Sequence, residues 1–243
     1  MVKLIYCLRR LPHLSQEEFQ QHWLEHHSHF GKQVKSIRRY VQCHALANDP
    51  IREALKQAGA SGVETYDGLA IAWFDSLEAL QAEMTKNPVV AAALEDEKYF
   101  IDHSRSTALL VDERVVVEPV GPGNVVLVEC LRRRSNIDRK LFSERWSHHQ
   151  HIGHKAHDLG LLMGYIQNHS LMGDAARVAG LGNNDEPWDG VVTAFFHSIA
   201  MFKALAAHPL AYQESFTDEK TFIDHSKSVD FMARRYVIKD LIR

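Results

Sequence analysis

A long internal repeat is the feature that most constrains how this chain folds. The pattern Phe-x-x-x-Trp-x-x-His occurs twice in 243 residues, first at Phe19, Trp23 and His26 and again, 123 positions later, at Phe142, Trp146 and His149. The segment Phe-Ile-Asp-His-Ser also occurs twice, at residues 100–104 and 222–226. Solenoids and propellers repeat about every 20–50 residues. This longer period predicts a duplicated domain, with halves at 1–118 and 124–243 and Gly121-Pro122-Gly123 between them.

Each half predicts the same order of elements. Helix starts are marked by the capping box at Ser15 and by Asp138, and second helices are interrupted near Pro88 and Pro209. Apolar runs predict four strands in each half, at 4–8, 39–46, 68–74 and 106–117 and at 125–131, 164–172, 190–196 and 228–238. The order strand-helix-strand-strand-helix-strand is that of a ferredoxin-like domain. Two such domains in one chain predict an α+β fold in which the sheets close into a pseudo-dimeric barrel.

Composition narrows the classes of partner. The chain is 45% hydrophobic and 24% charged, as in ordinary soluble globular proteins, and its net charge of −3 gives no reason to expect nucleic acid. No apolar run approaches the roughly 20 residues of a membrane helix. The odd set of Cys7, Cys43 and Cys130 has no metal-type spacing and suits a reducing compartment. We therefore expect a cytoplasmic protein that acts on a small-molecule substrate, without a nucleic-acid or membrane partner. Whether two chains associate as a homodimer stays open.

The first helix of each half carries a histidine on its apolar stripe. Positions i, i+4 and i+7 share a helix face, which places His26 beside Trp23 and His149 beside Trp146. Burial against aromatic rings lowers the pKa of a histidine, and a neutral imidazole in an apolar pocket can act as a general base or acid. The alternative is a core histidine whose ring nitrogen binds a backbone carbonyl. At the edge of the stripe the halves differ, with His22 in the first and Arg145 in the second.

Further candidate residues lie on the strands. Side chains four apart on a strand share a face, so the pairs Tyr40 with His44 and Tyr165 with His169 are expected to orient polar groups of a substrate or simply to pack. Arg9 and Arg132, at the ends of the first strands, are candidates for binding a substrate carboxylate.

Metal and hydrolase chemistry are disfavoured by the motifs. His22 and His26 have the i, i+4 spacing that can chelate zinc, but no Glu follows His22 and no cysteine cluster accompanies them, so no metal is predicted. Asp102 and Asp224 precede His-Ser pairs, but adjacent residues cannot form a catalytic triad, and a cap or turn role is favoured.

The motif Phe-x-x-His-Trp-x-x-His-His, the Asp-Gly before the third strand and the Asp-Glu-x-x-Phe-Ile-Asp before the last strand together resemble EthD-like proteins of the dimeric α+β-barrel superfamily. The resemblance spans nearly the whole chain, once per half, and so implies two tandem EthD-like domains. It also implies enzymes that often work without a cofactor on small aromatic, polyketide or muconolactone-type compounds, among them isomerases, decarboxylases and dehydratases. Other members of the superfamily bind haem or act as monooxygenases.

These observations predict a cofactor-independent isomerase or lyase that acts on a small unsaturated or aromatic carboxylic acid from aromatic-compound catabolism. His26, His149 or both would move the proton. The other candidate site residues are the catalytic candidates His22, Tyr40 and Tyr165 and the substrate-binding candidates Trp23, Trp146, His44, His169, Arg145, Arg9 and Arg132. Two alternatives stay open: a haem-binding or monooxygenase-type barrel, and a non-catalytic module that binds a small ligand.

Overall fold

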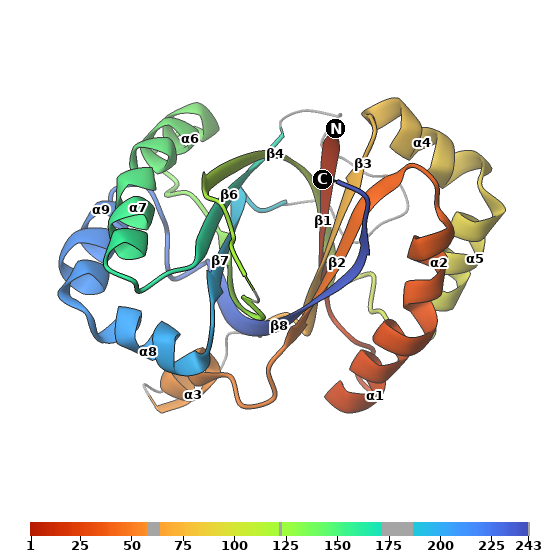
Figure 1. Cartoon of the computed structure of the whole chain (residues 1–243), viewed down its shortest axis with the longest axis horizontal. Helices are drawn as coiled ribbons and strands as arrows, with labels where there is room; N and C mark the ends of the chain where they lie inside the picture. Colours follow the sequence, from red (N-terminus) through yellow and green to blue (C-terminus); the bar gives the residue numbers. More distant parts are fainter. Residues whose placement is uncertain (58–63, 122, 172–186, 243) are drawn as a thin grey trace.

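Eight antiparallel strands form one closed barrel at the centre of the molecule (Figure 1). The computed structural model describes residues 1–57, 64–121, 123–171 and 187–242. The strands are β1 (Val2–Leu8), β2 (Ile37–Ala45), β3 (Gly68–Phe74), β4 (Thr107–Val117), β5 (Val125–Leu131), β6 (Gly164–Ser170), β7 (Gly190–Phe196) and β8 (Val229–Asp240). Around the barrel they follow the order β1-β3-β2-β8-β5-β7-β6-β4. Each half thus contributes four strands in the ferredoxin-like order, and the pairs β2–β8 and β4–β6 join the halves.

The helices cover the outside of the barrel in two groups on opposite sides, one per half, except that the helix Pro50–Gln57 of the first half lies on the side of the second half, where Ile51 packs against its core (Figure 1). The first half contributes α1 (Gln16–Gln21), the π-helical η1 (His22–His27), α2 (Ser28–Gln33), α3 (Pro50–Gln57), α4 (Leu77–Lys86) and α5 (Pro88–Glu97). The second contributes α6 (Arg139–His148), α7 (Gln150–Asp158), α8 (Ile199–Ala207), the π-helical η3 (Leu210–Ser215) and α9 (Phe216–Glu219). The predicted capping box is present, because Ser15 accepts a hydrogen bond from the backbone of Glu18 and the Glu18 carboxylate accepts one from that of Ser15.

Alternation along the strands separates three apolar cores. Inward-facing side chains of both halves fill the barrel, where the Sγ atoms of Cys7 and Cys130 lie 3.7 Å apart as free thiols. Outward-facing side chains of each half pack under that half's own helices. Two separate spaces between helices and sheet therefore exist, one in each half, and both lie outside the barrel.

Close packing explains the Asp-Gly pair before the third strand of each half. Trp23 lies so near the backbone of Gly68 that an added Cβ would be 2.5 Å from its ring atom Cζ3. Trp146 covers Gly190 in the same way. A glycine is needed at both positions because a side chain would push the tryptophan out of its place.

The predicted α+β barrel is confirmed, and the strand order is the expected one. Pro122 of the expected linker and most of the long polar segment before Trp188 lie outside the described residues. Among the residues that are described, the helices lack the combination of length and apolar composition that crossing a membrane requires.

Candidate functional site

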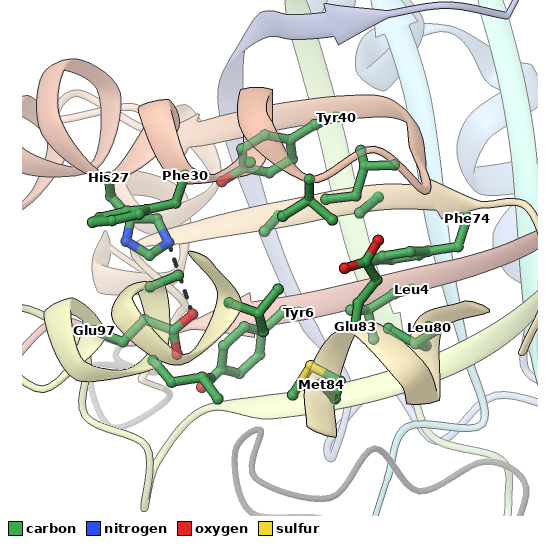
Figure 2. A pocket seen from close by; sticks show the side chains of 18 of the residues that line it. Leu4, Tyr6, His27, Phe30, Tyr40, Phe74, Leu80, Glu83, Met84 and Glu97 are labelled. Atoms are coloured by element: carbon green, nitrogen blue, oxygen red, sulfur yellow. Dashed lines mark ion pairs between the residues drawn. The ribbon is translucent and has the colours of Figure 1, made fainter. Parts of the chain in front are cut away.

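Each half has a cavity between its helices and the outer face of its sheet. The first measures about 120 Å³ and the second about 250 Å³. Figure 2 shows the first cavity, with His27 and Glu97 facing each other from two helices at one end and Glu83 and Met84 at the other. Its remaining walls are mostly apolar and aromatic, including Phe30, Tyr40 and Phe74.

His27, and not His26, occupies the first cavity. The His27 residue is 8% exposed and lines the cavity, whereas the His26 side chain is 65% exposed outside it. The prediction that His26 is buried is wrong, because it assumed a regular α-helix. The structure instead has the π-helical turn η1 at this point, which shifts the helix face by about one residue.

Comparison with the second half shows where the first half has one extra residue. Gly31 and Gly153 lie against the rings of Tyr40 and Tyr165 and are 122 positions apart, whereas the two stripe tryptophans are 123 positions apart. The extra residue of the first half therefore lies in or next to η1, and His27 is the equivalent of His149. As predicted, His149 is buried, at 5% exposure.

Asp96 orients the ring of His27. Nδ1 of His27 lies 2.8 Å from Oδ2 of Asp96 and donates a hydrogen bond to the carboxylate. Nε2 is then left with its lone pair, 3.8 Å from Oε1 of Glu97 (Figure 2). Burial lowers the pKa of His27 and outweighs the opposing effect of Asp96. Burial raises the pKa of Asp96, but hydrogen bonds from His27 and His22 outweigh it, so the net shift is downward. The pair holds a neutral imidazole beside an ionised carboxylate.

Glu97 is the acid of this cavity. It is 7% exposed, and burial together with the charge of Asp96 raises its pKa to about 8. Its Oε2 is buried and has no hydrogen-bond partner among the described residues. His103 Nε2 lies 3.5 Å from this atom, and His103 Nδ1 is hydrogen-bonded to Tyr6 Oη at 2.8 Å. At pH 7 a carboxyl with this pKa is mostly protonated and can donate a proton into the cavity.

Two of the predicted residues, Trp23 and Tyr40, form the wall of the first cavity. Tyr40 Oη accepts hydrogen bonds from Nε1 of Trp23 at 3.1 Å and from Nε2 of Gln42 at 3.0 Å. Burial raises the pKa of Tyr40 to about 12, so it stays neutral. His44 stacks on Trp23 at 4.4 Å between ring centroids and bonds Gln42 Oε1 at 2.9 Å, away from the cavity lining. Burial lowers its pKa to about 4.

The second half repeats this wall. Gln167 donates to Tyr165 Oη at 3.4 Å and to the backbone oxygen of Trp146 at 2.7 Å, and His169 lies over the Trp146 ring. Burial lowers the pKa of His169 to about 3. Tyr165 lines the second cavity and His169 does not.

His149 differs from His27 in the direction of its pKa shift. Its Nδ1 lies 2.7 Å from Asp218 Oδ2 and its Nε2 lies 3.4 Å from Glu219 Oε1. Burial lowers the pKa of His149, but the two carboxylates outweigh it and the net shift is upward. The two carboxylates thus favour the protonated form of His149, which makes it a poorer proton acceptor than His27.

The three predicted arginines lie outside both cavity linings. Arg9 donates to the backbone oxygen of Thr65 at 2.7 Å, Arg132 to that of Pro187 at 2.7 Å and Arg145 to that of Thr221 at 2.6 Å. Arg9 and Arg132 also lie over the rings of Tyr66 and Trp188. Arg9 and Arg132 thus hold the chain in place just before the third strand of each half. In these positions they do not reach either cavity, where a substrate carboxylate was expected to contact them.

Three metal-ligating groups come together beside the first cavity. His22, His26 and Asp96 bring one ligand atom each to within 4.8 Å of one another. His22 Nε2 is 3.0 Å from one oxygen of Asp96, and His27 takes the other. The hydrogen bonds of Asp96 to His22 and His27 account for this group, and we assign no metal to it.

Haem does not fit either cavity. Pockets for drug-sized ligands have volumes of about 300–1,000 Å³, and both cavities are smaller. The Nε2 atoms of His27 and His149 also face carboxyl oxygens, where an axial ligand would need open space.

Comparisons with known proteins agree on the fold. A model of the EthD domain matches residues 11–104 and 134–226. An anthrone oxidase-like protein superposes with a TM-score of 0.64 at 10% identity, over 99% of this chain and 94% of that one. A candidate monooxygenase from Lactobacillus acidophilus NCFM gives 0.57 at 8% identity, over 99% and 96%. A mutant chlorite dismutase from Candidatus Nitrospira defluvii gives 0.53 at 10% identity, over 98% and 92%. At such identities the likeness shows the α+β-barrel fold alone. Among curated proteins, none matches this sequence.

Proposed function

The chain belongs to the EthD domain family, and from that premise we propose that its first half is a cofactor-independent proton-transfer enzyme of the isomerase or lyase class. The observation that carries the proposal is the facing pair in the first cavity: a neutral His27, oriented by Asp96, and a protonated Glu97 at 3.8 Å. A base and an acid that are both neutral at the same pH suit the transfer of a proton between two atoms of one substrate.

The cavity lining favours an uncharged substrate. Among the described residues that line it, the ionisable side chains are Tyr6, His27, Tyr40, Glu83 and Glu97, and none is Lys or Arg. An ionised carboxylate would therefore lose its hydration without gaining a counter-charge, which is costly. We propose a small unsaturated or aromatic carbonyl compound in place of the carboxylic acid expected from the sequence.

In the proposed reaction, Nε2 of His27 removes a proton from a carbon next to the substrate carbonyl. Glu97 donates a hydrogen bond to the carbonyl oxygen and stabilises the enolate that forms. Asp96 stabilises the imidazolium and holds its tautomer. The imidazolium then returns the proton to the far carbon of the conjugated system, which completes an isomerisation. Where a hydroxyl leaves instead, Glu97 protonates it, water is eliminated, and the proton that His27 took from carbon passes from Nε2 to the Glu97 carboxylate 3.8 Å away, which restores both groups.

The second half would not perform this step, because its carboxylates favour the protonated form of its histidine. We therefore propose one proton-transfer site per chain, in the first half. This interpretation also gives the aromatic wall a defined role: Trp23 and Tyr40 fix the shape of the cavity, and neither exchanges a proton.

The test is a panel of small, uncharged unsaturated and single-ring aromatic carbonyl compounds, followed by ultraviolet absorbance and by deuterium uptake from D2O. We expect at least one compound to be isomerised or dehydrated by the wild type, and His27→Asn to slow this step about 10²–10⁴-fold. His149→Asn is the matched control and should stay within about twofold. Oxygen uptake coupled to turnover would assign the protein to the oxygenases instead. Equal losses in both variants would contradict a single site.

A further inference from the structure

The floor of the second cavity differs from that of the first at two facing positions. In the first half, Tyr6 of β1 pairs with Ala108 of β4. At the same place in the second half, Glu129 of β5 pairs with Asp230 of β8. The second half thus carries two carboxyl groups on adjacent strands where the first carries a phenol and a methyl group; Glu129 lines the cavity, and Asp230 lies beside it on the neighbouring strand without being part of the lining.

No cation compensates these two carboxyl groups within the described part of the chain. Neither Glu129 nor Asp230 has a hydrogen bond or ion pair there. The charged groups that act on them are other acids, Glu219 on both and Asp49 on Asp230. The histidines of this region are engaged elsewhere, His149 with Asp218 and Glu219, and His225 with Glu219 at 3.4 Å.

The walls of the cavity are suited to a cation that has an apolar body. Four aromatic residues line it, namely Tyr165, Phe196, Phe202 and Phe216. Aromatic faces attract ammonium groups, most strongly where water is excluded. The volume of about 250 Å³ exceeds that of the first cavity, and small residues such as Ala206 and Ala211 contribute to the space.

We propose that the cavity of the second half binds a small organic cation, a primary or quaternary amine on an apolar body, with its ammonium group at Glu129 and Asp230. Burial and the neighbouring acids raise the pKa of Asp230 to about 7 and that of Glu129 well above its usual range, as expected for a pair that lacks its counter-charge. The proposal rests on the second cavity alone and does not depend on the function proposed for the first.

Isothermal titration calorimetry with three probes of similar shape tests it. Benzylamine and benzyltrimethylammonium carry the cation, and benzyl alcohol is the neutral equivalent. We expect both cations to bind one per chain, and benzylamine to bind at least about tenfold more tightly than benzyl alcohol, a ratio that corresponds to about 1.4 kcal/mol. Absence of binding by both cations at millimolar concentration, or equal binding of benzyl alcohol, would overturn the proposal.

Paired variants locate the binding. Glu129→Gln and Asp230→Asn keep the shape of each side chain and remove one of two neighbouring like charges, so they should fold at least as well as the wild type. We expect each to weaken benzylamine binding about tenfold or more. Glu97→Gln in the first cavity is the matched control and should leave benzylamine binding within about twofold. Loss of binding in Glu97→Gln, with binding retained in the Glu129→Gln/Asp230→Asn double variant, would place the cation in the first half and contradict the assignment.

Discussion

Nε2 of His27 lies 3.8 Å from Oε1 of Glu97, and burial shifts the pKa values of these two groups in opposite directions. It lowers the pKa of the histidine below its usual value of about 6.5 and raises that of the glutamate to about 8. Between those two values both groups are neutral. The cavity therefore holds a proton acceptor and a proton donor together at neutral pH.

The first prediction concerns the pH dependence of turnover. Below the lowered pKa of His27 the base is protonated, and above about pH 8 the acid is ionised. We expect kcat/KM for a substrate found in the screen to follow a bell whose alkaline limb falls near pH 8. In Glu97→Gln that alkaline limb should disappear while the acid limb remains. A limb at the same pH in the variant would assign it to another group.

Glu97 should also make stability depend on pH. Its pKa is about 8 in the folded protein and near 4.5 when unfolded, so its contribution is fully present below about pH 4.5 and is lost as the pH rises through 8. Glu97→Gln cannot ionise and should become more stable than the wild type at pH 9, by on the order of a few kcal/mol. Urea unfolding at pH 5 and pH 9 measures the difference. Equal differences at both pH values would contradict the burial of an ionisable Glu97.

His149 should make stability depend on pH in the same direction as Glu97, but its replacement should destabilise the protein. The folded-state pKa of His149 is raised, so its stabilising contribution is full below about pH 6.5 and is lost as the pH rises through that raised value. His149→Asn leaves Asp218 and Glu219 without their cation and should destabilise the protein by about 3 kcal/mol at pH 6. Thermal melts at pH 6 and pH 9 should show a larger loss at pH 6, with turnover unaffected at permissive temperature.

Packing of tryptophan on glycine gives a prediction that does not involve charge. Gly68→Ala would place a Cβ 2.5 Å from the Trp23 ring and should cost about 1–3 kcal/mol, with a change in tryptophan fluorescence. Gly123→Ala is a matched control, since its Cβ would make an ordinary 3.4 Å contact with Phe195. If both variants unfold at the same urea concentration, Trp23 does not lie on Gly68.

Much of the fold followed from the sequence because the repeat and the apolar alternation are both visible in the order of residues alone. The capping box, the order of strands and the closure of two sheets into one barrel are all as expected. Helix periodicity gave the wrong helix face between Trp23 and His27. A π-helical turn there contains one more residue than a regular α-helical turn, and a fixed period of about 3.6 residues does not allow for it. The spacing His-His-x-His-x-Gly, shared by residues 26–31 and 148–153, carries the signal that would have aligned His27 with His149.

The acidic residues of the site were missed for other reasons. In the sequence, Glu97 and Glu219 stand out only as part of the motif before the last strand of each half. The motif does not show that they are buried, because their burial depends on tertiary packing. Glu129 interrupts an otherwise apolar strand and Asp230 precedes the apolar segment Phe231–Ala233, which is a visible signal, but their pairing depends on a register between strands far apart in the sequence. The placement of Arg9 and Arg132 could not be predicted because the backbone carbonyl groups that they bind belong to segments far away in the sequence.

The most direct test compares His26→Asn with His27→Asn in the same deuterium-uptake assay on a substrate of the enzyme. Both residues lie in one π-helical turn and approach Asp96, but only His27 reaches the cavity. We expect His27→Asn to lower the rate of proton transfer about 10²–10⁴-fold. The side chain of His26 is mostly exposed, so the rate in His26→Asn should stay within about twofold of the wild type. Full activity in His27→Asn, or an equal loss in His26→Asn, would contradict the assignment of His27 as the base.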